Sequence, residues 1–283
     1  MPSPVTFRDL TDADIPAGLR LCRQSGWNQT EADWRALLAP PSRFRAACIA
    51  DTIVGSAGAV VYGDRLAWVC MVLVDAAERG RGLGTSLMRQ VLEHVPGGVL
   101  VGLDATPKGQ AVYEKLGFEA GSTLTRLETT SPVTFADASP SVRAMTEADL
   151  PRVLALDRPV FGADRGRVLH AARATAPEYA WCVDDGESLV GYAFGRPGHD
   201  ADQIGPVVAL HAEAAAAMVA ASLRARPGRR YFLDAAPEPE WRRALADLGF
   251  REQRGFTRMY RGGRPPVPTG EQQCLAIFGP EFG

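Results

Sequence analysis

The 283-residue sequence predicts a mixed α/β fold, of the α+β kind, that is built twice. Segments of strand-like and helix-like periodicity follow one another in the same order in both halves. Three stretches of the first half also recur in the second half at an offset of about 135 residues. The length fits two domains of the usual size of about 100–200 residues.

The repeat covers nearly the whole chain. The first matching pair predicts a strand and a Thr-capped helix, the second a β-hairpin with a polar turn, and the third a strand leading to a helix that ends in Leu-Gly-Phe. These pairs are Phe7–Pro16 with Val142–Pro151, Ala47–Gly55 with Trp181–Gly191, and Leu103–Phe118 with Leu233–Phe250. The Ser-, Thr- and Pro-rich stretch Thr129–Pro140 separates the copies, which predicts domains at 1–130 and 140–283.

Each copy is expected to run as strand, helix, helical stretch, hairpin, long buried strand, helix, strand, last helix and closing strands. Near the C-terminus, Arg261–Pro268 contains two glycines and three prolines and is not expected to form regular structure. The apolar stretch Cys274–Phe278 reads as an additional edge strand.

A glycine-rich turn stands out in the first copy. Leu66–Asp75 is an almost unbroken apolar run, typical of a buried strand, and Thr85–Val95 has helical spacing up to Pro96. The turn between them, Arg79–Gly84, therefore opens a helix whose first N–H groups can hold a phosphate. Its spacing fits neither the P-loop nor the dinucleotide fingerprint. The alternative is a left-handed turn before an ordinary helix.

Arg79-x-x-Gly82-x-Gly84 after a strand ending at Val74 resembles the pyrophosphate-binding signature of the GNAT superfamily of N-acetyltransferases. Ala76 replaces the usual proline. The resemblance implies two tandem GNAT folds, each a central twisted mixed sheet flanked by helices, and acetyl-CoA (coenzyme A) as cofactor. It places cofactor contacts on the backbone of the strand, on the turn and on the later helix. These residues are Val72, Leu73, Val74, Arg79, Gly80, Arg81, Gly82, Leu83, Gly84, Thr85, Thr106 and Gly109.

Tyr113 is the candidate for acid catalysis. Thr106 can cap a helix with Pro107 at its first position, which would place Gly109 one turn before Tyr113 and leave room beside the phenol. The resemblance implies that Tyr113 protonates the departing thiolate of coenzyme A. A phenol, with a pKa of about 10, is protonated at neutral pH and can supply that proton to a thiolate. The alternative is a core tyrosine.

The remaining site residues come from the same half. The attacking amine must lose a proton, and the candidate bases are Glu31, Asp33 and Asp64, each of which could equally be a surface acid. Aromatic side chains in the segments that shape the acceptor pocket of GNAT enzymes give a candidate substrate-binding set, although aromatic residues are also common in cores. The members of this set are Trp27, Trp34 and Trp68, with Tyr62 nearby.

The second copy lacks these signatures. Gln203–Glu213 contains no glycine turn, and Leu245 stands where the first copy has Tyr113. We therefore expect 1–130 to be a catalytic domain and 140–283 to be a degenerate domain that is structural or shapes the substrate site.

The sequence thus predicts an acyltransferase enzyme, an N-acetyltransferase that moves acetyl from acetyl-CoA to a primary amine of a small molecule. An acyl-CoA sensor without turnover and acetylation of a peptide or protein amine are the alternatives, and mycothiol synthase-like, antibiotic-modifying and peptide-modifying activities are all compatible. A net charge of −2, scattered His and Cys, and no signal-like segment favour a cytoplasmic protein without nucleic acid, membrane or metal partners. A monomer, as a pseudo-dimer of domains, or a homodimer is expected.

Overall fold

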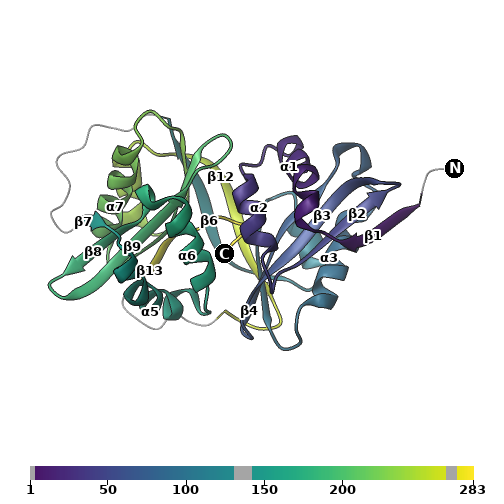
Figure 1. The fold of residues 1–283 in the computed structure, drawn as a ribbon, viewed down its shortest axis with the longest axis horizontal. Coiled ribbons are helices and arrows are strands. Elements are labelled where there is room, and N and C mark those ends of the chain that lie inside the picture. Colours follow the sequence, from purple (N-terminus) through teal and green to yellow (C-terminus); the bar gives the residue numbers. More distant parts are fainter. Residues whose placement is uncertain (1–3, 131–141, 266–272) are drawn as a thin grey trace.

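The computed structural model describes residues 4–130, 142–265 and 273–283. The chain forms two lobes of similar construction, joined by long strands that cross between them (Figure 1). The first lobe is built from β1 Val5–Asp9, α1 Ile15–Gln24, α2 Glu31–Leu38, β2 Arg43–Ile49, β3 Thr52–Tyr62, β4 Leu66–Val74, α3 Leu83–His94, β5 Leu100–Ala105, α4 Gln110–Glu114 and β6 Glu119–Thr129. The predicted mixed α/β class is confirmed.

The second lobe repeats this order, as the internal repeat predicts. Its elements are β7 Val142–Ala144, α5 Leu150–Phe161, α6 Gly166–Thr175, β8 Trp181–Asp185, β9 Ser188–Arg196, β10 Asp202–Ala209, α7 Ala212–Ala225, β11 Tyr231–Ala235, α8 Pro239–Asp247, β12 Arg251–Arg261 and β13 Gln273–Ile277. Short 3-10 turns occupy Asp12–Asp14, Ala76–Glu78, Glu147–Asp149 and Pro177–Tyr179.

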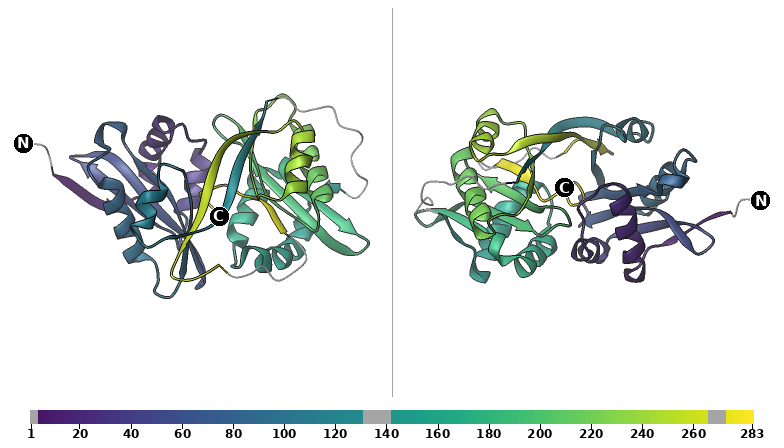
Figure 2. Two further views of the ribbon diagram at one scale, coloured as in Figure 1. Left: turned by 180° about the vertical axis from the view of Figure 1, so that it is seen from behind. Right: turned by 90° about the horizontal axis from the view of Figure 1, so that it is seen from above.

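One mixed sheet runs through both lobes. Its strand order is β1-β2-β3-β4-β5-β12-β6-β11-β13-β10-β9-β8-β7. The strands that follow the last helix of each copy have changed places, since β12 pairs with β5 and β6 pairs with β11. These two strands also pair with each other and bridge the lobes (Figure 2). The boundary near residue 130 therefore divides the repeat in sequence, but it does not divide the sheet in space.

Helices cover both faces of the first lobe. On one face, α3 buries Leu87, Met88 and Val91 against strand residues such as Leu103. On the other face, α1 and α2 belong to a cluster that continues into α5 and α6 of the second lobe. Because this shared cluster is a hydrophobic core, the two lobes hold each other in place. No helix in the described ranges has the length and apolar character to span a bilayer.

The strand β13 differs from its prediction. The stretch around Cys274–Phe278 was expected at a sheet edge, but β13 lies inside the sheet, between β10 and β11. These two strands pair directly only over Asp202–Ile204 and Tyr231–Leu233, and β13 fills the gap where they separate. Leu275, Ala276 and Ile277 are all buried. An apolar run covered on both faces is typical of an interior strand.

After β13 the chain crosses into the first lobe, where backbone oxygens of residues 280–283 accept hydrogen bonds. Tyr62 Oη donates to the oxygen of Phe282 at 2.7 Å, and Trp68 Nε1 donates to that of Pro280 at 2.9 Å. Arg165 Nη1 donates to the oxygen of Gly283 at 3.2 Å. The first two bonds hold the tail segment, residues 279–283, against β3 and β4, and the third joins it to the second lobe, so the C-terminal end lies between the lobes (Figure 1).

Candidate active site

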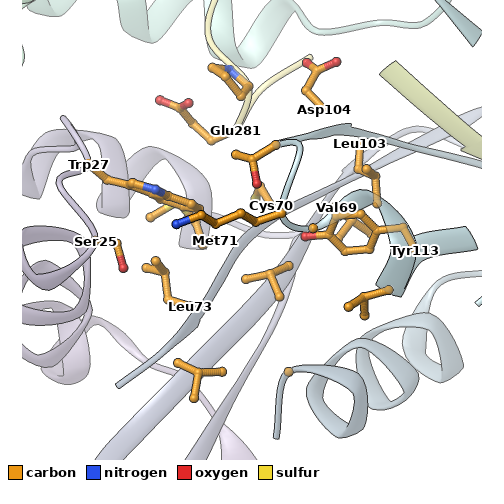
Figure 3. A pocket seen from close by; sticks show the side chains of 18 of the residues that line it. Ser25, Trp27, Val69, Cys70, Met71, Leu73, Leu103, Asp104, Tyr113 and Glu281 are labelled. Atoms are coloured by element: carbon orange, nitrogen blue, oxygen red, sulfur yellow. The ribbon is translucent and has the colours of Figure 1, made fainter. Parts of the chain in front are cut away.

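A cavity of about 920 Å³ opens where β4 and β5 separate. The two strands pair only over Leu66–Trp68 and Leu100–Gly102. Beyond that point β4 lines the cavity, together with the glycine turn, the end of β5 and α4 (Figure 3). The second half of the chain also contributes to the wall, through Arg254, Phe256, Pro280 and Glu281.

The glycine turn forms one end of this cavity. Gly80 and Gly82 have φ of 79° and 77°, in the left-handed region that favours glycine, and Gly82 is the residue from which α3 starts. A Cβ at Gly82 would meet nothing within 4 Å, so the space beside it is open for a ligand. The turn thus presents the positive end of α3 to the cavity.

Most of the predicted cofactor residues line this cavity. Those that do are Val72, Leu73, Val74, Arg79, Gly80, Gly82, Leu83, Gly84, Thr85, Thr106 and Gly109. Arg79 Nε donates to the backbone oxygen of Val74 at 3.1 Å. This bond holds the arginine side chain beside the end of β4. Arg81 is not among the lining residues and forms an ion pair with Glu78 instead.

A bulge in β4 lies in the cavity wall. The register of β3 and β4 shifts between Ser56 and Gly58, and Met71 opposite has a φ of 52°. Ser56 Oγ donates to the oxygen of Met71 at 2.8 Å and supports this conformation, which is unusual for a residue with a side chain. Since β5 pairs no further than Gly102, the backbone beyond Trp68 can offer N–H groups to a ligand.

Tyr113 enters the cavity from α4, and its hydroxyl points toward β4 (Figure 3). Burial raises the pKa of Tyr113 to about 12, so the phenol keeps its proton at neutral pH. A Cβ at Gly109 would lie 2.9 Å from Cε2 of the tyrosine ring, which shows why a glycine is needed there. The helix itself begins later than predicted, at Gln110, and Thr106 contributes its backbone oxygen rather than a side-chain cap.

The predicted bases lie outside the cavity. Glu31 is on the surface, where it pairs with Arg35 at 2.6 Å, and Asp64 is exposed in the turn between β3 and β4. Asp33 is buried, but both of its carboxylate oxygens have partners. Oδ2 accepts from the backbone N–H of Thr30, the residue that caps α2, and Oδ1 binds Arg196 Nη1 at 2.6 Å. None of the three is among the lining residues.

Three carboxylates lie in the cavity wall: Glu78, which pairs with Arg81, Asp104, which pairs with Arg258, and Glu281 (Figure 3). Glu281 is the one with a buried oxygen that lacks a partner among the described residues. It is 3% exposed, and its Oε1 accepts a hydrogen bond from Arg196. Its Oε2 is buried with no hydrogen-bond partner in the described part of the chain. Burial raises the pKa of Glu281 above that of an ordinary glutamate. No local sequence signal indicates this residue, because it comes from the far end of the other copy.

The candidate aromatic residues separate into two groups. Trp27 lines the cavity. Trp34 is fully buried in the core, where its ring fills the space beside Gly18 and contacts Phe44. Trp68 is 1% exposed and supports the tail segment rather than the cavity. The prediction that Trp34 and Trp68 line the site is therefore not supported by their positions, because both rings are enclosed by protein.

The equivalent region of the second half has a different structure. The gap between β10 and β11 is filled by β13. The helix α7 starts at His211, whose Nδ1 accepts from the N–H of Ala214 at 3.3 Å, so one first-turn N–H already has a partner. Leu245, in the place of Tyr113, is fully buried in the core.

The fold and the site define a tandem α/β protein whose first copy has a glycine-rich turn at the start of α3, in the wall of a cavity. Residues 9–118 match the model of the acetyltransferase (GNAT) family, and residues 153–274 match that of an acetyltransferase (GNAT) domain. The chain belongs to the GNAT family of acetyltransferases and contains two GNAT domains.

Relatives of known sequence or structure span the same length. The chain is 22% identical over 269 residues to the uncharacterized N-acetyltransferase YitH of Bacillus subtilis, covering 94% of this chain and 95% of that one. A crystal structure assigned as an acetyltransferase from Pyrococcus horikoshii superposes with a TM-score of 0.81 at 20% identity, covering 99% and 96% of the two chains. A tandem GNAT protein of the clavulanic acid biosynthesis pathway superposes with a TM-score of 0.63 at 16% identity, covering 92% and 99%. At these identities the structures show a common fold.

Proposed function

We propose that this protein transfers the acetyl group of acetyl-CoA to a primary amine of a small molecule, and that the N-terminal half is the active one. The observation that carries this proposal is the contrast between the two gaps in the sheet. The gap between β4 and β5 opens into a cavity that contains the glycine turn and Tyr113, whereas the gap between β10 and β11 is filled by β13.

The residues of the first gap fit acetyl-CoA. Gly80 and Gly82 leave open space at the start of α3, so the diphosphate can approach the backbone N–H groups of the helix. Arg79 lines the cavity there and supplies a positive charge. The pantetheine chain would lie along the unpaired side of β4, whose backbone can donate to the thioester oxygen. Acetyl-CoA supplies the activated acetyl group.

Tyr113 is proposed to act as the general acid. As the amine nitrogen bonds to the acetyl carbon, the bond between that carbon and sulfur breaks and leaves a thiolate. The phenol then donates its proton to the sulfur. Its pKa of about 12 ensures that the proton is present at neutral pH, and a thiolate, whose thiol has a pKa of about 8.5, is stabilised by that donation.

Glu281 is proposed to accept the proton that the amine loses. Its Oε2 is buried and makes no hydrogen bond within the described residues, so an ammonium or amine group that enters beside it would supply the missing partner. Arg196 binds the other carboxylate oxygen and fixes its direction. Because burial raises the pKa of Glu281, it is a stronger base than an exposed glutamate.

A panel of primary amines, assayed for release of free thiol from acetyl-CoA and for an acetylated product by mass spectrometry, tests this function. We expect thiol release that depends on the amine and continues over many turnovers. The rate should rise with pH as Glu281 loses its proton, and this rise should occur above the usual pH range of a glutamate. Binding of acetyl-CoA without thiol release for any amine or peptide would instead identify an acyl-CoA sensor.

A further inference from the structure

The cavity wall contains an arginine that forms no ion pair with any described residue. Arg254 lines the cavity from β12, and its Nε is buried without a hydrogen-bond partner in the described ranges. Within these ranges it has no ion pair, and its guanidinium lies over the ring of Phe256 at 5.0 Å. A partly buried cation without a counter-ion is an unfavourable arrangement unless a ligand completes it.

Three other arginines of the sheet have acidic partners. Arg126 binds Asp234 through two hydrogen bonds of 2.8 and 2.7 Å. Arg258 binds Asp104 through two of 2.9 Å, and Arg196 binds Asp33 and Glu281. Arg254 is the exception among these four residues, although it lies on the same sheet.

Arg254 is also opposed by a like charge. It stands directly across from Arg126 in the pairing of β12 with β6, an arrangement that is destabilising between adjacent strands. Burial and the charge of Arg126 lower the pKa of Arg254, and the more distant charges of Asp234 and Glu281 offset this only in part. An anion placed beside Arg254 would relieve both effects, since it would supply the missing counter-charge and weaken the repulsion between the arginines.

The position of Arg254 in the sheet separates it from the proposed diphosphate site. Side chains alternate along a strand, so Arg254 and Phe256 share the face of Arg258, which stacks on Trp68. The tail segment with Glu281 packs on this face through Trp68. The next residue of β12, Met259, belongs to the opposite face with α3. The glycine turn lies at the start of α3, on that opposite face. Arg254 therefore lies on the side of the cavity where Glu281 would receive the amine.

We propose that the acceptor amine also carries an acidic group, which binds to Arg254 while the amine lies toward Glu281. This inference rests on the proposed function and specifies its substrate class. A guanidinium forms paired hydrogen bonds to either a carboxylate or a phosphate, so both kinds of acid fit the subsite. The acid of the ligand neutralises Arg254, and the unpartnered Oε2 of Glu281 meets the amine.

Matched amines that differ only in their acid test this inference. L-Phenylalanine and 2-phenylethylamine form the carboxylate pair, and O-phosphoethanolamine and ethanolamine form the phosphate pair. Each amine is assayed with wild type, Arg254→Met and Arg251→Met by amine-dependent thiol release, and its binding is measured by calorimetry without acetyl-CoA. Arg251 is the matched control, because it lies on the same strand but is exposed.

In at least one pair, we expect kcat/KM and affinity to be at least tenfold higher for the acid-bearing amine. Arg254→Met should reduce both values for that amine by about 10- to 100-fold, as expected for losing hydrogen bonds between charged groups, whereas Arg251→Met should leave them unchanged. The pair that responds shows whether the acid is a carboxylate or a phosphate.

The two readouts distinguish this inference from the proposed function. Equal turnover within both pairs, or equal values in wild type and Arg254→Met, overturns the acidic-acceptor inference and leaves the transferase standing. Binding that depends on Arg254 but gives no thiol release supports the subsite and counts against the transferase. The absence of both binding and turnover for every acid-bearing amine overturns the inference.

Discussion

Replacing Gly82 by glutamate should abolish measurable binding of acetyl-CoA. Gly82 precedes the first turn of α3 with a φ of 77°, and the space beside it is open to the cavity. A glutamate would put its side chain in that space and a negative charge at the positive end of the helix. The loss of two or three charge-assisted hydrogen bonds, each of about 1.5–3 kcal/mol, is enough to remove detectable affinity. Isothermal titration with acetyl-CoA measures this.

Two control variants separate the causes of that loss. Gly82→Ala adds the strain of the left-handed φ without the charge, so it should retain more affinity than Gly82→Glu. His211→Glu places the same charge at the start of α7 in the second half and should leave the affinity nearly unchanged. Circular dichroism and melting curves show whether each variant is folded. Strong binding by a folded Gly82→Glu protein would mean that the diphosphate lies elsewhere.

Replacing Tyr113 by phenylalanine should lower kcat at least tenfold while the affinity for acetyl-CoA changes little. The substitution removes the hydroxyl that points toward β4 but keeps the ring packed against Phe118 and beside Gly109. A tenfold loss corresponds to about 1.4 kcal/mol of transition-state stabilisation. Steady-state thiol release, together with calorimetry for binding, separates the two quantities.

Tyr260→Phe is the matched control for this prediction. Tyr260 lies on β12, outside the cavity lining, where its ring contacts Trp68. Removing its hydroxyl should leave kcat unchanged. A Tyr113→Phe protein with the activity of wild type would assign the proton donation to water or to another group.

The parts of the fold that follow local rules could be predicted from the sequence. The apolar run of β4, the glycine turn and the periodic α3 are contiguous, so their order indicates their structure. The repeat also predicted the second lobe, and Leu245 in place of Tyr113 marked the difference between the copies. Most of the predicted cofactor residues line one cavity for the same reason, since they lie on adjoining elements.

The remaining features depend on contacts between distant segments. The exchange of β6 and β12 could not be predicted, because either strand has a sequence that could pair with β5 or β11. The interior place of β13 depends on a gap that forms only in the folded sheet. Glu281 and Arg254 reach the cavity from the second half, so no pattern in the first half, which contains Glu31, Asp33 and Asp64, indicates them. Trp34 is an aromatic residue of the kind that often lines a pocket, but its side chain packs in the core.

The number of acetyl-CoA molecules bound per chain tests the central claim, that the cofactor enters only the open gap of the first half. Isothermal titration should give one site per chain in the wild type and none in Gly82→Glu. The reason is that β13 occupies the second gap and His211 already caps α7. Two equivalent sites per chain would show that the second half also binds the cofactor, and one site that persists in Gly82→Glu would show that the glycine turn does not hold the diphosphate. Either result would contradict the account.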